Sequence, residues 1–312
     1  AANLFVVNMG TNVADFSPAR KTVFAPEVQA AQAAVEATGT SANGLPGRVY
    51  NEFRSYEDYG MRAGVEDVWG SSPLRLGRYA ALFEDFPLDR MWRLLGVEHV
   101  LTWRKELFGP SELLGEFPQV TDTTYVHRLP QPVQRAWLVS SVHPADDDEA
   151  LALLADHQFN LETTAVLANT ELAGSVPGGS TPGLSGATDA TNARVQLQQR
   201  GPANLHVEVH DSVGGLLVIA ENWMPGWRVQ NVTCAGGCPD DTPLGLQAFE
   251  PQRADLTLLG IPVPAGSFTF DLVYQPDSIR AGLWISGVTL LVLVVLTAWR
   301  GLARKKPGKA PA

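Results

Sequence analysis

The stretch "GLLVIAENWMPGWRV" at residues 215–229 contains an uninterrupted apolar run, a turn and the start of a second extended segment. The apolar run has the length of a buried strand. Pro225 and Gly226 favour a tight turn after it, because proline fixes one backbone angle and glycine permits a positive φ. Two indoles, Trp223 and Trp227, flank this turn. We therefore predict two strands joined by an aromatic corner.

Short segments with strand spacing lie on both sides of this corner, separated by Gly, Pro and Asp residues that favour turns. They cover residues 194–199, 204–210, 215–221, 227–230, 246–250, 254–260 and 267–274. Seven short strands with frequent turns are typical of an antiparallel β-sandwich, which we place at residues 194–276.

Earlier in the chain, helical and strand spacing alternate. Residues 25–39 predict a helix that begins at Pro26 and ends at Gly39. Residues 88–103 predict a second helix, a stop at Gly96 and then a strand.

These patterns predict a mixed α+β chain. We expect an N-terminal α/β domain at residues 1–172, followed by the antiparallel β-sandwich and one C-terminal transmembrane helix. Residues 173–193 are rich in Gly, Ser, Thr and Pro without an apolar period, which indicates a flexible linker between the two domains.

The transmembrane helix is predicted at residues 281–299, which carry no charge. At ~1.5 Å per residue this segment spans about 28 Å, close to the hydrocarbon thickness of a bilayer. Trp284 and Trp299 lie near its two ends, and the basic tail at residues 300–312 follows only the second end. The positive-inside rule then places the tail in the cytoplasm and residues 1–280 outside the cell membrane. A buried core helix is the alternative.

The net charge and the first residues of the chain indicate which partners to expect. The net charge is −10 although the tail is basic, so the rest of the chain is strongly acidic and we expect no nucleic-acid partner. No segment near Ala1 resembles an export signal. We therefore expect the lipid bilayer as a partner, together with an N-terminal transmembrane core of the same protein that precedes Ala1.

Cys234 and Cys238, in "CAGGC", are the cysteines of this sequence. An exported location permits a disulfide between them, and the two intervening glycines allow so short a loop to close. Free thiols are the alternative. Two thiols alone are too few ligands for a metal.

One weak candidate for a metal-binding site occurs among the sequence motifs. His206, Glu208 and His210 alternate along a predicted strand and so share one face, which is a zinc-like ligand set. A polar outer face opposite a buried apolar face explains the same pattern, and we expect no metal and no cofactor. No catalytic residue can be assigned from the sequence motifs.

The aromatic corner allows two interpretations. In one, Trp227 packs into the core and Trp223 covers the turn. In the other, the aromatic side chains contact a sugar ring or the headgroup zone of a membrane. The candidate contact residues are Trp223, Trp227 and Tyr274.

Several segments together resemble the YfhO-like bacterial membrane proteins. "LLVIAENWMPGWRV" is similar to that family's approximate motif "LVLSENYYPGW", and "VPAGSFTFDLVYQPDSIRAGLWIS" at residues 263–286 is similar to its closing pattern before the last membrane helix. "GVEDVWGSSPLRLGRYAALF", "RLLGVEHVLT" and "QRAWLVSS" resemble upstream family segments. The chain departs from the family after "PGW", where "RVQNVTCAGGCPDD" is longer than the usual hairpin.

The resemblance implies a multi-span membrane protein related to the GT-C glycosyltransferases, which transfer sugars from lipid-linked donors to cell-envelope polymers such as lipoteichoic acid. In such enzymes the catalytic carboxylates lie in loops that would precede residue 1, so whether this chain acts in catalysis stays open. The expected substrate partner is a lipid-linked sugar or an envelope glycan. The alternatives are a non-catalytic, membrane-anchored module that binds glycan or protein, and a structural lid on the membrane core.

Overall fold

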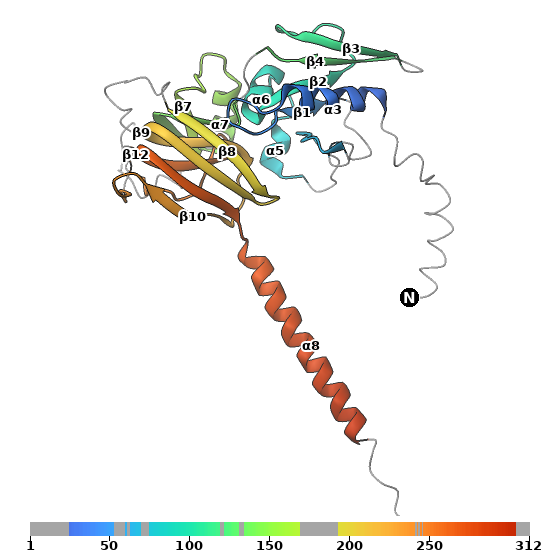
Figure 1. The fold of residues 1–312 in the computed structure, drawn as a ribbon, viewed down its shortest axis with the longest axis vertical. Coiled ribbons are helices and arrows are strands. Elements are labelled where there is room, and N and C mark those ends of the chain that lie inside the picture. Colours follow the sequence, from blue (N-terminus) through green and yellow to red (C-terminus); the bar gives the residue numbers. More distant parts are fainter. Residues whose placement is uncertain are drawn as a thin grey trace, which may run out of the picture.

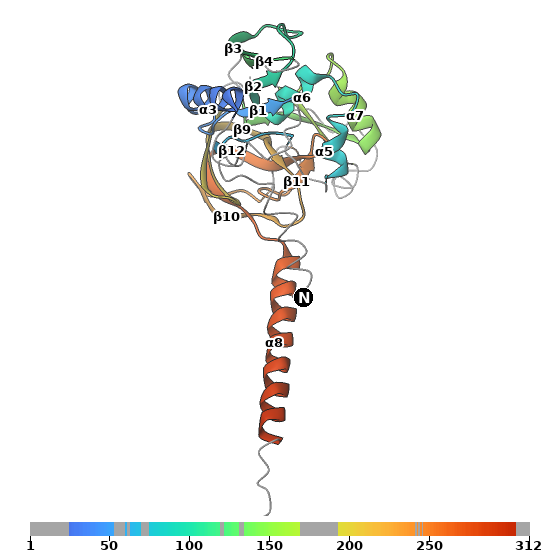
Figure 2. The same ribbon diagram turned by 90° about the vertical axis from the view of Figure 1, so that its right-hand side faces the viewer.

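The computed structural model describes residues 25–52, 60, 63–69, 75–118, 122–130, 134–168, 193–240, 242, 244 and 246–303. The strand expected at residues 4–10, nearly all of the expected linker and the end of the basic tail lie outside these residues. The described residues form a mixed α+β fold, which confirms the predicted fold class. Figures 1 and 2 show one long helix, α8, that extends away from a folded part made of two sheets and short helices, which we call the body.

The smaller sheet lies at the end of the body far from α8 (Figure 1). Its strand order is β1-β2-β4-β3, with β1 and β2 parallel and the other pairs antiparallel. The strands are β1 (Arg48–Asn51), β2 (Val97–Thr102), β3 (Glu112–Pro118) and β4 (Thr123–Arg128).

Helix α3 (Pro26–Thr38) packs against this sheet through Ala31 and Val35. It begins at Pro26 and is followed by Gly39 with a φ of 71°, as predicted. The further helices of the described body are α5 (Gly77–Ala81), α6 (Leu88–Leu95) and α7 (Asp147–Ala155). Helix α6 ends at Gly96 in the left-handed conformation and β2 follows directly, which confirms the predicted helix, stop and strand.

The larger sheet has eight strands in the order β5-β9-β12-β11-β7-β6, with β8 added beside β9 and β10 beside β12. All its pairs are antiparallel except β6 with β7. The strands are β5 (Ala136–Val139), β6 (Ser141–Ala145), β7 (Thr164–Ala168), β8 (Arg194–Gly201), β9 (Asn204–Asn222), β10 (Trp227–Cys234), β11 (Gln252–Ala254) and β12 (Leu258–Tyr274).

The strands differ from the expected set in three ways. The segments predicted at 204–210 and 215–221 are one continuous strand, β9, and residues 258–274 are likewise one strand, β12. The strand predicted at 246–250 is absent, because Phe249 has a positive φ and lies in a turn. Strands β5, β6 and β7 join the same sheet as β8 to β12, so this sheet runs across the expected domain boundary at residues 173–193.

The sequence predicts two separate sheets of a sandwich, whereas the structure has one sheet with long, bent strands. The first half of β9 buries Val207 and the second half buries Leu217 in the same core cluster, so the two halves of one sheet enclose a common core. Gly215 lies at the bend with a φ of 150°, and a Cβ atom there would collide with the carbonyl oxygen of Val139 in β5. This close approach explains why glycine is required at this position.

Burial of both faces explains the apolar run of the opening sequence. Leu216 and Val218 face the core beneath α6 and α7, whereas Leu217 and Ile219 face the core inside the bend. A strand buried on both faces has no polar alternation. The first half of β9, by contrast, buries every second residue, in agreement with the alternation seen in the sequence.

Helix α8 (Asp277–Ala303) is the candidate membrane span. Residues Asp277–Arg300 are long and apolar enough to cross a bilayer, and none of this apolar segment is buried against the body. Large apolar side chains such as Leu283 and Leu290 are more than 60% exposed. The alternative of a buried core helix is therefore not supported within the described residues.

A buried carboxyl group lies in the turn between β11 and β12. Asp255 is completely buried; it accepts a hydrogen bond from the backbone N–H of Val166 at 2.7 Å, and its own N–H donates to the Val166 carbonyl at 2.8 Å. Burial raises the pKa of Asp255 to about 7. In the unfolded chain the pKa of this group returns to its ordinary value near 3.8.

This shift predicts a pH dependence of stability. Because the folded-state pKa is raised, the contribution of Asp255 is fully present below about pH 4 and is lost as the pH rises to about 7. Urea unfolding of the full chain in detergent should therefore show the wild type losing stability relative to Asp255→Asn over this interval. Parallel pH profiles for the two proteins would contradict burial of an ionisable Asp255.

Candidate functional site

The aromatic turn packs directly against the start of α8. A Cβ atom at Gly226, whose φ is 119°, would lie 2.7 Å from Cα of Pro276. The backbone N–H of Gln275 donates to the carbonyl of Gly226 at 2.8 Å, and Arg228 pairs with Asp277 at 2.9 Å. The turn and the first residues of α8 therefore form one packed junction between the body and the candidate membrane span.

The three predicted contact residues are placed differently around this junction. Trp227 pairs with Tyr274 across β10 and β12, with ring centroids 5.2 Å apart, and its Nε1 donates to the carbonyl of Asn222 at 3.0 Å. Trp223 packs separately and is half-buried against the core. Its backbone N–H donates to the carbonyl of Thr257 at 2.8 Å. Trp227 is half-buried too, so both indoles contribute to packing. A contact of these residues with glycan or membrane stays a prediction.

Beside Trp227 lies a group of four charged side chains, which we call the ion-pair cluster. It consists of Arg48, Glu66, Arg135 and Glu221. Arg48 contacts Glu66 at 3.0 Å and Glu221 at 2.6 Å, and Arg135 contacts each of the same two carboxylates at 2.9 Å. Each carboxylate thus binds both guanidinium groups, and the cluster has no net charge.

Backbone carbonyl groups complete the cluster. Arg135, which is 1% exposed, also donates to the carbonyl of Pro46 at 2.9 Å. Arg48 donates to the carbonyl of Leu95 at 3.1 Å and to that of Ala220. These bonds connect β1 with α6 and β9, and Arg135 lies directly before β5, so the cluster ties the smaller sheet to the larger one.

Glu66 and Arg48 are held in their charged forms, whereas burial and the neighbouring Arg48 lower the pKa of Arg135. Burial opposes ionisation of Glu66, but Arg135 and Arg48 outweigh it and hold the pKa of Glu66 below its usual range. Burial likewise opposes the charge on Arg48, yet Glu221 and Glu66 outweigh it and raise its pKa. Glu66 therefore stays ionised at neutral pH and is suited to accept hydrogen bonds, not to donate a proton as a general acid.

A small pocket opens beside the ion-pair cluster. It has a volume of about 220 Å³ and is lined by Glu66, Arg135, Glu221, Trp227, Ala203 and Asn204, among others. We call it the base pocket, because the Tyr274 N–H donates to the carbonyl of Ala203 at 3.0 Å and α8 begins three residues later. Its wall therefore lies next to the start of the candidate membrane span.

A larger and mostly apolar cleft lies away from α8, between α6 and the segment that connects β2 to β3. Its volume is about 720 Å³, and Trp92, Leu107, Phe108 and Leu129 contribute to its lining. Phe108 is 75% exposed. The shape and apolar lining suit a ligand or a protein side chain, but this cleft has few charged groups that would define its chemistry.

The predicted metal candidates do share one face of β9. His206 contacts Glu208 at 3.3 Å, and His210 contacts the same carboxylate at 3.9 Å. The other ring nitrogen of His206 bonds to Asp271 at 2.7 Å. Among the residues that the structure describes, no group of three or more His, Cys, Asp and Glu side chains is arranged to hold a metal ion. Polar contacts on an outer sheet face account for these residues.

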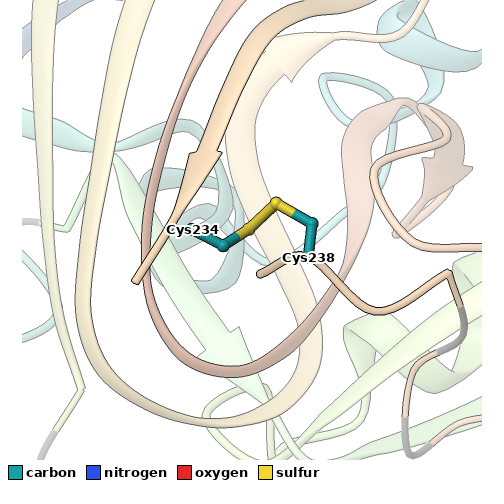
Figure 3. Close-up of a disulfide and its surroundings, with 2 residues drawn as sticks. All are labelled: Cys234 and Cys238. Atoms are coloured by element: carbon teal, nitrogen blue, oxygen red, sulfur yellow. A yellow bond between two sulfur atoms is a disulfide. The ribbon is translucent and has the colours of Figure 1, made fainter. Parts of the chain in front are cut away.

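The predicted disulfide between Cys234 and Cys238 is confirmed (Figure 3), with Cα atoms 5.2 Å apart. It closes the end of β10, and the intervening Gly236 and Gly237 both have positive φ values. Disulfides form and persist in oxidising compartments, and the extracytoplasmic location of the body stays a prediction.

Removal of this disulfide should have a small effect on stability. Because the closed loop is so short, the double substitution Cys234→Ser and Cys238→Ser is expected to cost about 2 kcal/mol or less. Thermal unfolding of the full chain with and without a reducing agent measures this cost. A loss of folding on reduction would show that the disulfide stabilises parts of the body beyond the turn that it closes.

The ion-pair cluster and the base pocket were not predicted from the sequence. The available signals were weak: a single Arg135 before the strand "AWLV" and a single Glu221 after "GLLVIA". Charges that flank an apolar strand are usually solvent-exposed, so neither signal indicates a buried pair.

The comparisons with known proteins are negative. No family model, no curated protein and no solved structure matches the chain. The resemblance to the YfhO-like proteins therefore stays a prediction.

Proposed function

We propose that this chain is the extracytoplasmic C-terminal part of a membrane protein that transfers sugars from lipid-linked donors to cell-envelope polymers. In this proposal the body holds a sugar-bearing substrate at the outer membrane surface. The observation that carries the proposal is the position of the base pocket: Ala203 in its wall bonds to Tyr274, and α8 begins at Asp277.

The packing of the junction gives further support. The "PGW" turn and the "YQPDS" segment that resemble the YfhO-like pattern are far apart in the sequence, yet Gly226 contacts Pro276 and Trp227 contacts Tyr274. Residues with that resemblance thus form the connection between body and membrane helix. A rigid connection suits a domain that must keep a substrate at a fixed height above the bilayer.

A second candidate function is a non-catalytic module, anchored in the membrane, that binds envelope glycan or a partner protein. The ionised state of Glu66 favours it, because the two carboxylates of the base pocket are already engaged by arginines. The coding sequence upstream of Ala1 distinguishes the two candidates. Several hydrophobic spans with an acidic residue in the first outer loop favour the transferase, and a single signal peptide favours the module.

Mass analysis of cell-envelope glycans tests the transferase directly. Deletion of the gene is expected to remove a sugar substituent from an envelope polymer, and the full-length gene supplied in trans should restore it. An unchanged glycan profile after deletion would contradict transfer and leave the binding module as the better account.

A further inference from the structure

We propose that the base pocket is a binding site for one uncharged, polyhydroxylated ring, that is, a single neutral sugar residue. This inference rests on the proposed function and names the substrate class that the body would hold. It uses the pocket's size, its charge balance and the residues in its wall.

The size of the pocket limits the ligand to one ring. Drug-sized ligands occupy pockets of about 300–1,000 Å³, whereas this one has about 220 Å³. An acyl chain or a disaccharide would therefore extend out of it. The turn between β8 and β9 at Pro202 and Ala203 closes one side.

The charge balance of the wall selects an uncharged ligand. Glu66, Glu221 and Arg135 line the pocket, and Arg48, which lies outside the lining, contacts both carboxylates, so the cluster as a whole has no net charge to attract an ion. The guanidinium groups are directed at the carboxylates, which leaves a phosphate or uronate without a free cation in this cluster.

The hydrogen-bonding capacity of the wall fits hydroxyl groups. Within the described residues, Glu66 and Glu221 each bind both arginines through one oxygen, Oε2 and Oε1 respectively, and the other oxygen has no partner. Carboxylate oxygens accept hydrogen bonds from sugar hydroxyls, and the Trp227 indole in the same wall offers an apolar surface for the C–H groups of a ring.

Saturation-transfer NMR on the full chain in lipid nanodiscs tests this inference. The probes are methyl glycosides of glucose, galactose, mannose and N-acetylglucosamine, with methyl glucuronide and glucosamine as charged counterparts. At least one neutral glycoside should receive saturation and bind at least tenfold more tightly than its charged counterparts. Absence of signal from every neutral glycoside, or equal binding of the charged ones, would overturn the inference.

Two variants locate the binding. Ala203→Trp should fill the pocket and abolish the signal, whereas Ala265→Trp, at an exposed position of β12, should leave it unchanged. Glu66→Gln keeps the shape of the side chain and is expected to weaken binding about tenfold, which decides the matter if Ala203→Trp does not fold. A full signal from a folded Ala203→Trp, or unchanged affinity of Glu66→Gln, would place binding elsewhere.

The source of the sugar is distinguished by a second arm. The preferred sugar is offered as a free glycoside and as the headgroup of a glycolipid in the nanodisc. Stronger binding of the glycolipid indicates a lipid-linked sugar, whereas equal binding indicates a polymer or a free sugar. Either result supports sugar binding in the base pocket. If gene deletion alters envelope glycans but no neutral sugar binds, this inference fails while the proposed function stands. If a neutral sugar binds but gene deletion leaves the envelope glycans unchanged, this inference stands and the proposed sugar transfer fails.

Discussion

Replacement of Arg135 by methionine is expected to lower the free energy of unfolding by about 2–3 kcal/mol, because it removes the buried partner of two partly exposed carboxylates. Arg135 is 1% exposed and contacts Glu66, Glu221 and the carbonyl of Pro46. Without it, Glu66 and Glu221, which are 39% and 25% exposed, share Arg48 alone, and the cluster gains a net negative charge.

The measurement is urea unfolding of the full chain in detergent, with Arg93→Met as the matched control. Arg93 pairs with Glu162 at 2.8 Å, but these side chains are 35% and 72% exposed. Removal of such a surface pair is expected to cost less than about 1 kcal/mol. Equal costs for the two variants would mean that the ion-pair cluster does not hold the two sheets together.

Replacement of Gly226 by alanine is expected to destabilise the junction by about 3 kcal/mol or more, because it combines a strained backbone with a collision. The new Cβ atom would meet the backbone of Pro276 at 2.7–2.9 Å, and neither chain segment is the flexible end of a side chain. The hydrogen bond from Gln275 to Gly226 should break when the segments separate.

Hydrogen exchange in nanodiscs measures this effect at the Gln275 amide, which should be protected in the wild type and exposed in Gly226→Ala. Gly266→Ala is the control: Gly266 has a φ of 116°, close to the 119° of Gly226, but nothing lies within 4 Å of its Cβ position. If the Gln275 amide exchanges equally fast in both variants, backbone strain alone explains the effect, and packing of the turn against Pro276 does not stabilise the start of α8.

Local patterns predicted much of the fold. The Pro26 start and Gly39 end of α3, the Gly96 stop after α6 and the alternation in the first half of β9 depend on interactions between near neighbours in the sequence. The candidate membrane span was equally clear, because its composition alone defines it.

The course of the long strands was less predictable. Gly214 and Gly215 have the composition of a turn, but here they permit a bend within β9 while pairing with β12 continues on both sides of them. Whether two adjacent glycines end a strand or bend it depends on the partner strands, which sequence spacing does not identify.

The candidate site was beyond prediction for the same reason. Arg48, Glu66, Arg135 and Glu221 come from four separate segments, and only the assembled sheets bring them into contact. The sequence did single out Trp227 by its position beside the turn, and the structure places it in the wall of the base pocket. Trp223, the outward candidate, packs on the core instead of lining that pocket.

If the base pocket serves sugar transfer at the outer membrane surface, as we propose, blocking it should change the glycan profile of the cell envelope, and three strains measure this. The strains carry a deletion of the gene, the Ala203→Trp variant or the Ala265→Trp variant, with protein levels matched for the two variants. We predict that Ala203→Trp loses the same sugar substituent as the deletion, whereas Ala265→Trp keeps the wild-type profile. A wild-type profile in the Ala203→Trp strain, beside a clear loss in the deletion strain, would contradict a role of this pocket.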